Sequence, residues 1–382
     1  MWDVIGGGGI ERRQEGKGCS AQALRPESPQ NLPTSSGDSG RWRPNPGLPG
    51  GKALLTKGFP NLMFSRFRPR VFVYALISSG ILSAFAGQTL AQSSVIVVDT
   101  FNRKVHVAGH ANSRRPVGGL AKIATGMVAL DWSVASKVGV NVLAAVPAYA
   151  PQMAGINVLG IQPGDKLTLR DLIYATMMGG DDLAAITLAD FVGRDHLYRL
   201  GQQGDPQVEF VRQMNQLAYR EGATGTRFQN PHGYENTRSI GYSTAADIAR
   251  LSLYAVSRPA MRFYTNQRSR SITIYRGGQQ LSVPVNNTNA LLGDSGIDGV
   301  KASSTPRAGG CVAVSAERPA SVYKQADGSS LIYRHRLVVV VLGSVNPFGE
   351  AKALLDQGWN AYNRWVAAGR PITDEKQLLN HF

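Results

Sequence analysis

The spacing of hydrophobic and polar positions changes along the chain and divides it into regions of different predicted structure. SVIVVD and KVHVA predict two strands at 94–99 and 104–108, joined by a short turn. The next region has apolar residues at helical spacing. It predicts helices at 120–130, 169–178, 182–192, 207–221 and 244–256, with Thr168 as the cap of the second.

From residue 271 the pattern changes back to strands. The segments ITIY, VKAS, CVAVSAE and RLVVVVLGS each predict one, and an amphipathic helix at 348–367 follows. We expect one sheet whose first strands, 94–99 and 104–108, come from the N-terminal side and whose last strands come from the C-terminal side, with helices between. This order predicts an α+β fold in one domain, 92–368, followed by a tail at 369–382.

The first 91 residues have a different character. Residues 1–62 are rich in Gly, Pro, Ser and Arg without a hydrophobic period, which predicts a disordered segment or one included by a mis-assigned start. Residues 63–91 then combine arginines, an apolar run and Thr89-Leu90-Ala91, which is typical of a cleaved signal peptide. The alternative is an uncleaved anchor, but the run is shorter than the roughly 20 apolar residues of a membrane-spanning helix.

Charge and cysteine content narrow the possible partners. The formal net charge is +15, and residues 92–382 keep 30 basic and 21 acidic residues, a net charge of +9. In an exported protein this charge favours anionic envelope components over nucleic acid, with membrane contact only through the signal peptide. Cys311 is the one cysteine after residue 91, so we expect a buried, inert thiol. The scattered histidines lack metal-ligand spacing, and we expect neither metal nor cofactor.

Several motifs together resemble one protein family. TRFQNPHGYENTRSIGYSTAADIARLS, residues 226–252, contains F-x-N-P-H-G followed by S-T-A-x-D, and NNTNALL, GIDGVK and AGGC follow it. These segments resemble the serine D-alanyl-D-alanine carboxypeptidases, the low-molecular-mass penicillin-binding proteins of peptidase family S11. The resemblance covers about 95–365. It implies the penicillin-binding-protein/β-lactamase-like fold, an antiparallel sheet flanked by helices beside an all-helical lobe.

The resemblance also implies three catalytic motifs, and this chain departs from each. In the family, a serine at a helix start precedes a lysine by three residues, so both lie on one helix face. Here the segment PVGGLAKIAT has Gly119 at the serine position and keeps the lysine as Lys122. The family's Ser-x-Asn motif resembles GGDD, in which Gly179 replaces the serine and Asp181 the asparagine.

The third motif, Lys-Thr-Gly, binds the substrate carboxylate in the family. It reads KAS here: Lys301 is kept, Ala302 lacks the hydroxyl, and Ser303 adds a side chain. Ser303, Ser304 or Thr305 could still supply a hydroxyl. All three motifs have therefore lost the hydroxyl that the family places there.

These losses predict a static ion network at the former catalytic site. A buried lysine needs a compensating charge, and we expect Asp181 to supply it in a cluster of Lys122, Asp181 and Lys301. We expect Asp182 to cap the helix that follows it. His232 is predicted to be a hydrogen-bonded structural histidine, and Tyr234 and Tyr242 are predicted to pack.

Three functions remain open at this point. The first is a catalytically inactive homologue in the periplasm or cell envelope that binds peptidoglycan stem peptides or an envelope protein that handles them. The second is an active carboxypeptidase with a relocated nucleophile, Ser303 or Ser304, although a hydroxyl on a strand is expected to lie away from the helix start and its lysine. The third is a structural envelope protein without a small ligand. A β-lactamase is disfavoured, because no deacylating glutamate is evident.

Overall fold

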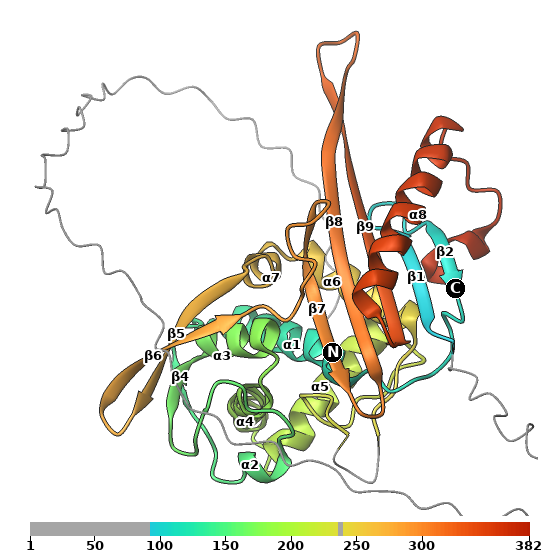
Figure 1. The fold of residues 1–382 in the computed structure, drawn as a ribbon. Coiled ribbons are helices and arrows are strands. Elements are labelled where there is room, and N and C mark those ends of the chain that lie inside the picture. The colour runs from blue at the N-terminus through green and yellow to red at the C-terminus, as the bar shows by residue number, and fades with distance from the viewer. Residues whose placement is uncertain (1–91, 236–239) are drawn as a thin grey trace, which may run out of the picture. The chain divides into compact units, whose positions relative to one another are not determined.

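The computed structural model describes residues 92–235 and 240–382 (Figure 1). The segments predicted at 1–62 and 63–91 lie outside these residues. Within the described part, the larger sheet has five strands in the order β2-β1-β9-β8-β7, and each paired strand is antiparallel to its neighbour. These strands are β1 (Ser94–Asp99), β2 (Val105–Gly109), β7 (Ile297–Thr305), β8 (Gly309–Lys324) and β9 (Ser330–Ser344).

This sheet confirms the predicted order, because strands from the two ends of the patterned region lie side by side in it. Residues 94–99 of β1 pair with residues 337–342 of β9. The valine run of β9 is buried on both faces of the sheet, which explains why its sequence is continuously apolar rather than alternating. Helix α8 (Pro347–Ala367) covers one face through Leu355 and Trp359, and helix α6 (Ala245–Ser257) lies against the other (Figure 1).

Helices fill the region between the first and last strands of the sheet. They are η1 (Gly118–Ala121), α1 (Lys122–Ser136), α2 (Ala150–Met153), α3 (Leu169–Tyr174), η2 (Ala175–Gly179), α4 (Asp182–Arg199), α5 (Pro206–Arg220), α6 and α7 (Pro259–Thr265). Thr168 caps α3 as predicted, accepting a hydrogen bond from Asp171 N. Helix η2 is one π-helical turn that continues α3.

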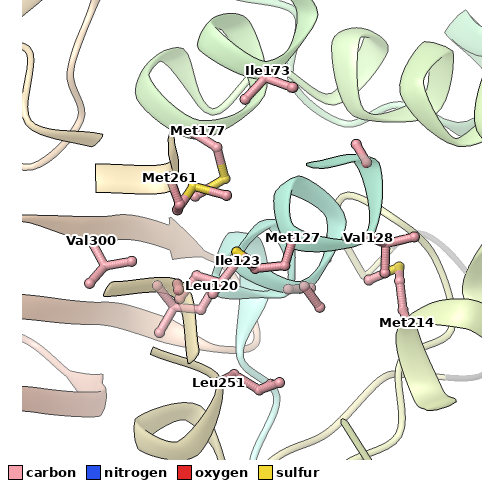
Figure 2. Close-up of a cluster of buried hydrophobic side chains, with 14 of the residues drawn as sticks. Leu120, Ile123, Met127, Val128, Ile173, Met177, Met214, Leu251, Met261 and Val300 are labelled. Carbon is pink, nitrogen blue, oxygen red and sulfur yellow. The ribbon is translucent and has the colours of Figure 1, made fainter. Parts of the chain in front are cut away.

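Helix α1 is the centre of the helical part of the core. Figure 2 shows Leu120, Ile123 and Met127 pointing into a cluster that also contains Met177 and Met261. These side chains come from η1, α1, η2 and α7, so the start of α1 is fixed from several directions. A helix that is apolar on all sides is typical of a core position, and it gives Lys122 at its first turn little access to water.

A second sheet differs from the prediction. The segment ITIY was expected in the main sheet, but it forms part of a separate antiparallel sheet in the described chain. Its order is β3 (Leu143–Ala145), β4 (Lys166–Thr168), β5 (Ser269–Arg276) and β6 (Gln279–Asn286). Strand β6 (QQLSVPVN) was not predicted: Leu281, Val283 and Val285 alternate along it, but it contains Pro284, which disfavours a strand inside a sheet. Such a sequence suits an edge strand, where a missing N–H breaks no ladder.

The segment at 369–382 is packed rather than a free tail. Leu379 is fully buried, and its carbonyl accepts a hydrogen bond of 2.6 Å from Arg250 Nη2. Leu378 also pairs with Lys104 next to β2. In the described ranges, no helix is both long and apolar enough to cross a membrane.

Candidate active site

The three segments that resemble catalytic motifs meet at one cavity of about 310 Å³, which we call the motif cavity. It lies between the start of α1, the junction of η2 with α4, and the edge strand β7. The predicted residues that line it are Gly119, Lys122, Gly179, Lys301, Ala302 and Ser303. Asp181, also predicted for the site, is buried outside the lining, and Asp182 lines the cavity instead.

Gly119 lies in η1 at the entry to α1 and has no side chain to act as a nucleophile. Its backbone N–H donates a hydrogen bond of 2.9 Å to Ser303 Oγ on β7. A Cβ added at Gly119 would lie 2.7 Å from that oxygen and 3.0 Å from Ser303 Cβ. Ser303 therefore fills the space that a side chain at position 119 would need.

Lys122 pairs with Asp182, which corrects the predicted partner. Its Nζ lies 2.6 Å from Asp182 Oδ1 and donates a second hydrogen bond of 2.8 Å to the His232 carbonyl. The side chains of Lys122 and Asp182 are 3% and 1% exposed, so this is a buried salt bridge. Charges in such a position are retained only when they are paired and hydrogen-bonded.

The second oxygen of Asp182 fixes one wall of the motif cavity. Oδ2 accepts hydrogen bonds of 2.9 Å from the backbone N–H groups of Gly155 and Ile156. Ile156 lines the cavity. The same carboxylate thus neutralises Lys122 and holds the 155–156 segment in place.

Asp181 has the role that the sequence analysis gave to Asp182. It is the N-cap of α4, where its Oδ1 accepts a hydrogen bond of 3.0 Å from Ala184 N and its Oδ2 one of 3.2 Å from Leu159 N. Burial raises the pKa of Asp181 to about 6, against the effect of these two bonds. The predicted helix start at residue 182 held the signal for this, because the residue before a helix is its N-cap.

Gly179, predicted for the second motif, and its neighbour Gly180 both line the motif cavity. A Cβ at Gly179 would contact Val285, at 3.1 Å, whereas a Cβ at Gly180 would lie 3.4 Å from Lys301 Nζ. A side chain that reaches the lysine would therefore have to start from position 180.

Lys301 is 1% exposed, and among the described residues no carboxylate forms an ion pair with it, contrary to the predicted cluster. Its Nζ donates to Thr288 Oγ1 at 2.8 Å and to the Ala302 carbonyl at 3.0 Å. Burial, and then the charge of Lys122, lower the pKa of Lys301 to about 7. Sequence reasoning missed Thr288, although it lies inside NNTNALL, the stretch that leads to the third motif.

The other hydroxyls of β7 are placed differently. Ser304 is exposed at the cavity lining, and Thr305 Oγ1 donates a hydrogen bond of 2.6 Å to Glu235 Oε1. The expectation that a strand hydroxyl lies away from the helix start is wrong for Ser303, because its Oγ contacts Gly119 N at the start of η1. The hydrogen bonds of Lys122 Nζ go to Asp182 Oδ1 and to the His232 carbonyl rather than to Ser303 Oγ.

His232 and Cys311 also border the motif cavity. His232 is 1% exposed, and its Nδ1 accepts a hydrogen bond of 3.2 Å from Tyr234 N, as expected for a structural histidine. Burial is the main cause that lowers its pKa to about 4, so the ring is neutral. Burial also raises the pKa of Cys311 to about 11, which keeps this thiol protonated.

This arrangement agrees with a comparison of the whole sequence with known families. The sequence pattern of the peptidase S11 family, described as D-alanyl-D-alanine carboxypeptidase, matches residues 83–322. The chain belongs to the D-alanyl-D-alanine carboxypeptidase family. The resemblance inferred from the motif segments is confirmed.

Curated members of the carboxypeptidase family give the same result at moderate identity. The chain is 29% identical over 296 residues to D-alanyl-D-alanine carboxypeptidase DacC of Escherichia coli, covering 73% of this chain and 66% of DacC. It is 28% identical over 258 residues to a D-alanyl-D-alanine carboxypeptidase of Streptomyces sp. K15, covering 64% and 84%. The chain thus spans just under two thirds of the length of DacC.

Solved structures confirm the predicted fold. The crystal structure of the Streptomyces K15 DD-transpeptidase matches with a TM-score of 0.58 at 22% identity, covering 70% of this chain and 96% of that one. The D-alanyl-D-alanine carboxypeptidase DacD of Francisella tularensis matches with a TM-score of 0.56 at 20% identity, covering 69% of each chain. The α+β penicillin-binding-protein-like fold, with helices flanking an antiparallel sheet, is therefore established for this family member.

Proposed function

We propose that this chain is a catalytically inactive member of the carboxypeptidase family that binds the carboxyl-terminal end of peptidoglycan stem peptides. The observation that carries the proposal is the exchange at the nucleophile position. Gly119 has no hydroxyl, and Ser303 fills the space beside it, 2.7 Å from where a Cβ would lie. Position 119, just before α1, therefore has no side chain that could act as a nucleophile, and Ser303 occupies the space that such a side chain would need.

The state of Lys122 supports the same conclusion. A lysine can take a proton from a hydroxyl only as a free amine. In this site the ammonium of Lys122 forms a buried salt bridge of 2.6 Å with Asp182 and a hydrogen bond with the His232 carbonyl. The amine that family chemistry would use as a base is therefore held in a charge pair.

Ligand binding is supported by what the motif cavity retains. Its volume of about 310 Å³ suits the end of a peptide, and Ile156, Val158, Tyr234 and Phe348 provide apolar walls. Lys301 faces this space and has no carboxylate partner among its hydrogen bonds. A peptide carboxylate would supply the missing negative charge. The named activity of the relatives, carboxypeptidase, fits a ligand with a free carboxyl end.

A specific contact favours a second candidate, an active enzyme with Ser303 as nucleophile. Ser303 Oγ accepts a hydrogen bond from Gly119 N and so lies at the start of the helix, where negative charge is stabilised. This candidate is weaker because Lys122 is paired with Asp182 and cannot accept the hydroxyl proton. A structural envelope protein with an unoccupied cavity is the third possibility.

The cell envelope is the proposed location. The signal-peptide pattern at 63–91 and the net charge of +9 in residues 92–382 support export to a compartment with anionic polymers. Either the stem peptide itself or an envelope protein that handles it would then be the partner.

One experiment separates the three candidates. The purified full chain and its Ser303→Ala and Lys301→Met variants are incubated with a fluorescent penicillin and, separately, with a peptide that ends in D-Ala-D-Ala. We expect no covalent label, no D-alanine release, and saturable peptide binding that Lys301→Met weakens at least about tenfold.

A stoichiometric label or D-alanine release would overturn the proposal. If that activity disappeared in Ser303→Ala, the relocated nucleophile would replace it. Absence of both label and peptide binding would favour the structural protein.

A further inference from the structure

A second cavity lies far from the motif cavity, at the other end of α8. It has a volume of about 390 Å³ and is lined by Phe101, Asn102, Ile332, Tyr333, Arg334, Tyr362 and Arg370. We call it the distal cavity. Phe348 at the motif cavity and Tyr362 at the distal cavity are 14 residues apart on α8, which is about 21 Å along a helix.

The distal cavity exists because the β8–β9 hairpin extends beyond the rest of the sheet (Figure 1). The pairing of β1 with β9 ends at Leu337, and that of β7 with β8 ends at Ala316. The two strands continue to pair with each other as far as Lys324 and Ser330. The base of this ribbon, the β1–β2 turn and the end of α8 therefore form three walls around an open space.

Two arginines at the distal cavity carry no ion pair with a carboxylate in the described part of the chain. They are Arg334 on β9 and Arg370 after α8. Arg336, two residues further along β9, differs: its guanidinium contacts Asp298 and Glu317. The side chain of Arg370 is hydrogen-bonded to Tyr362 and interacts electrostatically with Asp99, so the donors available for an anion are those of Arg334 and the remaining donors of Arg370.

Arg370 is held in position by its surroundings. Its backbone N–H donates to the Trp365 carbonyl at 2.9 Å, and the next carbonyl, that of Pro371, accepts a hydrogen bond of 2.8 Å from Trp365 Nε1. The guanidinium lies 4.1 Å from the centre of the Tyr333 ring. This stacking orients a planar donor, which lowers the conformational entropy lost when it binds an anion.

The rest of the lining includes two further aromatic side chains, Phe101 and Tyr362. Phe101 is 53% exposed in the turn between β1 and β2, so its ring is accessible from solvent. Tyr362 is 4% exposed, and its hydroxyl is hydrogen-bonded to His335 Nδ1 at 2.7 Å. Asp99 Oδ2 accepts hydrogen bonds of 2.8 Å from both the backbone and the side chain of Asn102, which fixes the turn that carries Phe101.

We propose that the distal cavity binds an acidic saccharide, a sugar ring that bears a carboxylate or a phosphate. The ring lies against Phe101, and its anionic group is bound by Arg334 and Arg370. Flat apolar faces stack on aromatic side chains, and guanidinium groups bind carboxylate and phosphate oxygens in pairs. The inference does not depend on the proposed function, because no residue lines both cavities.

Binding of three soluble sugars to the full chain tests this assignment. N-acetylmuramic acid carries a carboxylate, N-acetylglucosamine 6-phosphate carries a phosphate, and N-acetylglucosamine is neutral. We expect at least one acidic sugar to bind, and the neutral sugar to bind at least about tenfold more weakly than it. The acidic sugar that binds more tightly identifies the source of the anion, a wall glycan or a phosphorylated sugar. Equal binding of the neutral sugar, or no binding of any of the three, overturns the proposal.

Variants locate the site. Arg334→Gln and Arg370→Gln are each expected to weaken binding of the acidic sugar at least about tenfold, whereas Arg364→Gln, an exposed position on α8, leaves it unchanged. Lys301→Met is also expected to leave it unchanged, which separates this test from the stem-peptide test. Arg334 is exposed on the ribbon, so its variant keeps the fold. Equal affinities in Arg334→Gln and the unmodified chain would refute the assignment.

Discussion

Ser303 and Gly119 occupy one space between strand β7 and the start of α1. The Ser303 hydroxyl accepts a hydrogen bond from Gly119 N at 2.9 Å, and its oxygen lies 2.7 Å from the point where a Cβ on residue 119 would be. In the family motifs, position 119 has the larger residue and position 303 the smaller. The side chain that is missing at position 119 and the side chain that is added at position 303 therefore compensate each other in volume.

A double-mutant cycle between these residues should show strong coupling. Gly119→Ser alone places a side chain against Ser303 and is expected to lower the free energy of unfolding by roughly 1–3 kcal/mol. In a Ser303→Gly background the same substitution has room and should cost at least about 1 kcal/mol less. Urea denaturation of the four proteins gives the coupling energy. Additive effects would show that the two side chains do not compete.

The sequence predicted the main features of the fold because they depend on local patterns. The apolar runs of β1 and β9, the cap at Thr168 and the helix of 348–367 are each encoded within a few residues. The separate sheet was missed because β3 and β4 have only three residues each and β6 contains Pro284. Which sheet β5 joins depends on tertiary packing that its own alternating pattern does not specify.

The sequence also predicted which segments meet at the motif cavity, but not how their side chains pair. Asp181 and Asp182 are adjacent and chemically identical, so composition could not assign the cap and the ion pair. If α4 began one residue later, Asp182 would take the N-cap position that Asp181 occupies. The distal cavity was missed because its walls come from segments more than 200 residues apart, with no motif to connect them.

The two aspartates should respond differently to removal of their charge. Because the pKa of Asp181 rises to about 6 on folding, its contribution to stability is fully present below the unfolded value near 3.8 and is lost as pH rises through 6. Asp181→Asn keeps the cap acceptor but puts an amide donor where Oδ2 accepts from Leu159 N, so we expect its stability relative to the unmodified chain to be roughly 1–3 kcal/mol more favourable at pH 7.5 than at pH 4. Thermal unfolding at both pH values measures this.

Asp182→Ala is expected to destabilise the protein by roughly 3–5 kcal/mol at pH 7.5, because it leaves Lys122 buried without a counter-charge. Adding Lys122→Met should recover part of this loss, since the uncompensated charge is then gone. If Asp181→Asn were the more damaging of the two variants, the assigned roles would be wrong.

Cys311 should be unreactive in the folded protein although it borders the motif cavity. Burial raises its pKa to about 11, and its Sγ contacts the Ala308 carbonyl at 3.6 Å. At pH 8 the thiolate fraction is therefore on the order of a thousandth. We expect a thiol reagent to modify the unfolded chain at least about a hundredfold faster than the folded chain. Comparable rates in the two states would contradict the buried position.

Peptide binding at Lys301 should weaken as pH rises. Its pKa is lowered to about 7, so the ammonium that attracts a carboxylate is present below this value and is lost above it. We expect the affinity for a peptide ending in D-Ala-D-Ala to fall between pH 6 and pH 8.5, with proton uptake on binding at pH 7.5. Lys301→Arg stays charged across this range, and any binding it retains should vary little with pH. A flat profile in the unmodified chain would remove Lys301 from the binding site.

Lys301 also makes the stability of the unliganded chain depend on pH. The unfolded lysine has a pKa near 10.5 and the folded one about 7, so between these values the unfolded chain binds more protons and stability rises with pH. Below pH 7 Lys301 is charged in both the folded and the unfolded chain, so the free energy of unfolding is lowered by the full cost of burying the ammonium. Lys301→Met is therefore expected to raise the free energy of unfolding by roughly 2–4 kcal/mol at pH 6 and by much less at pH 10. Lys352→Met, at an exposed position on α8, should change it by less than about 0.5 kcal/mol at either pH. A gain that is equal at pH 6 and pH 10 would mean that Lys301 enters the fold with its ordinary proton affinity.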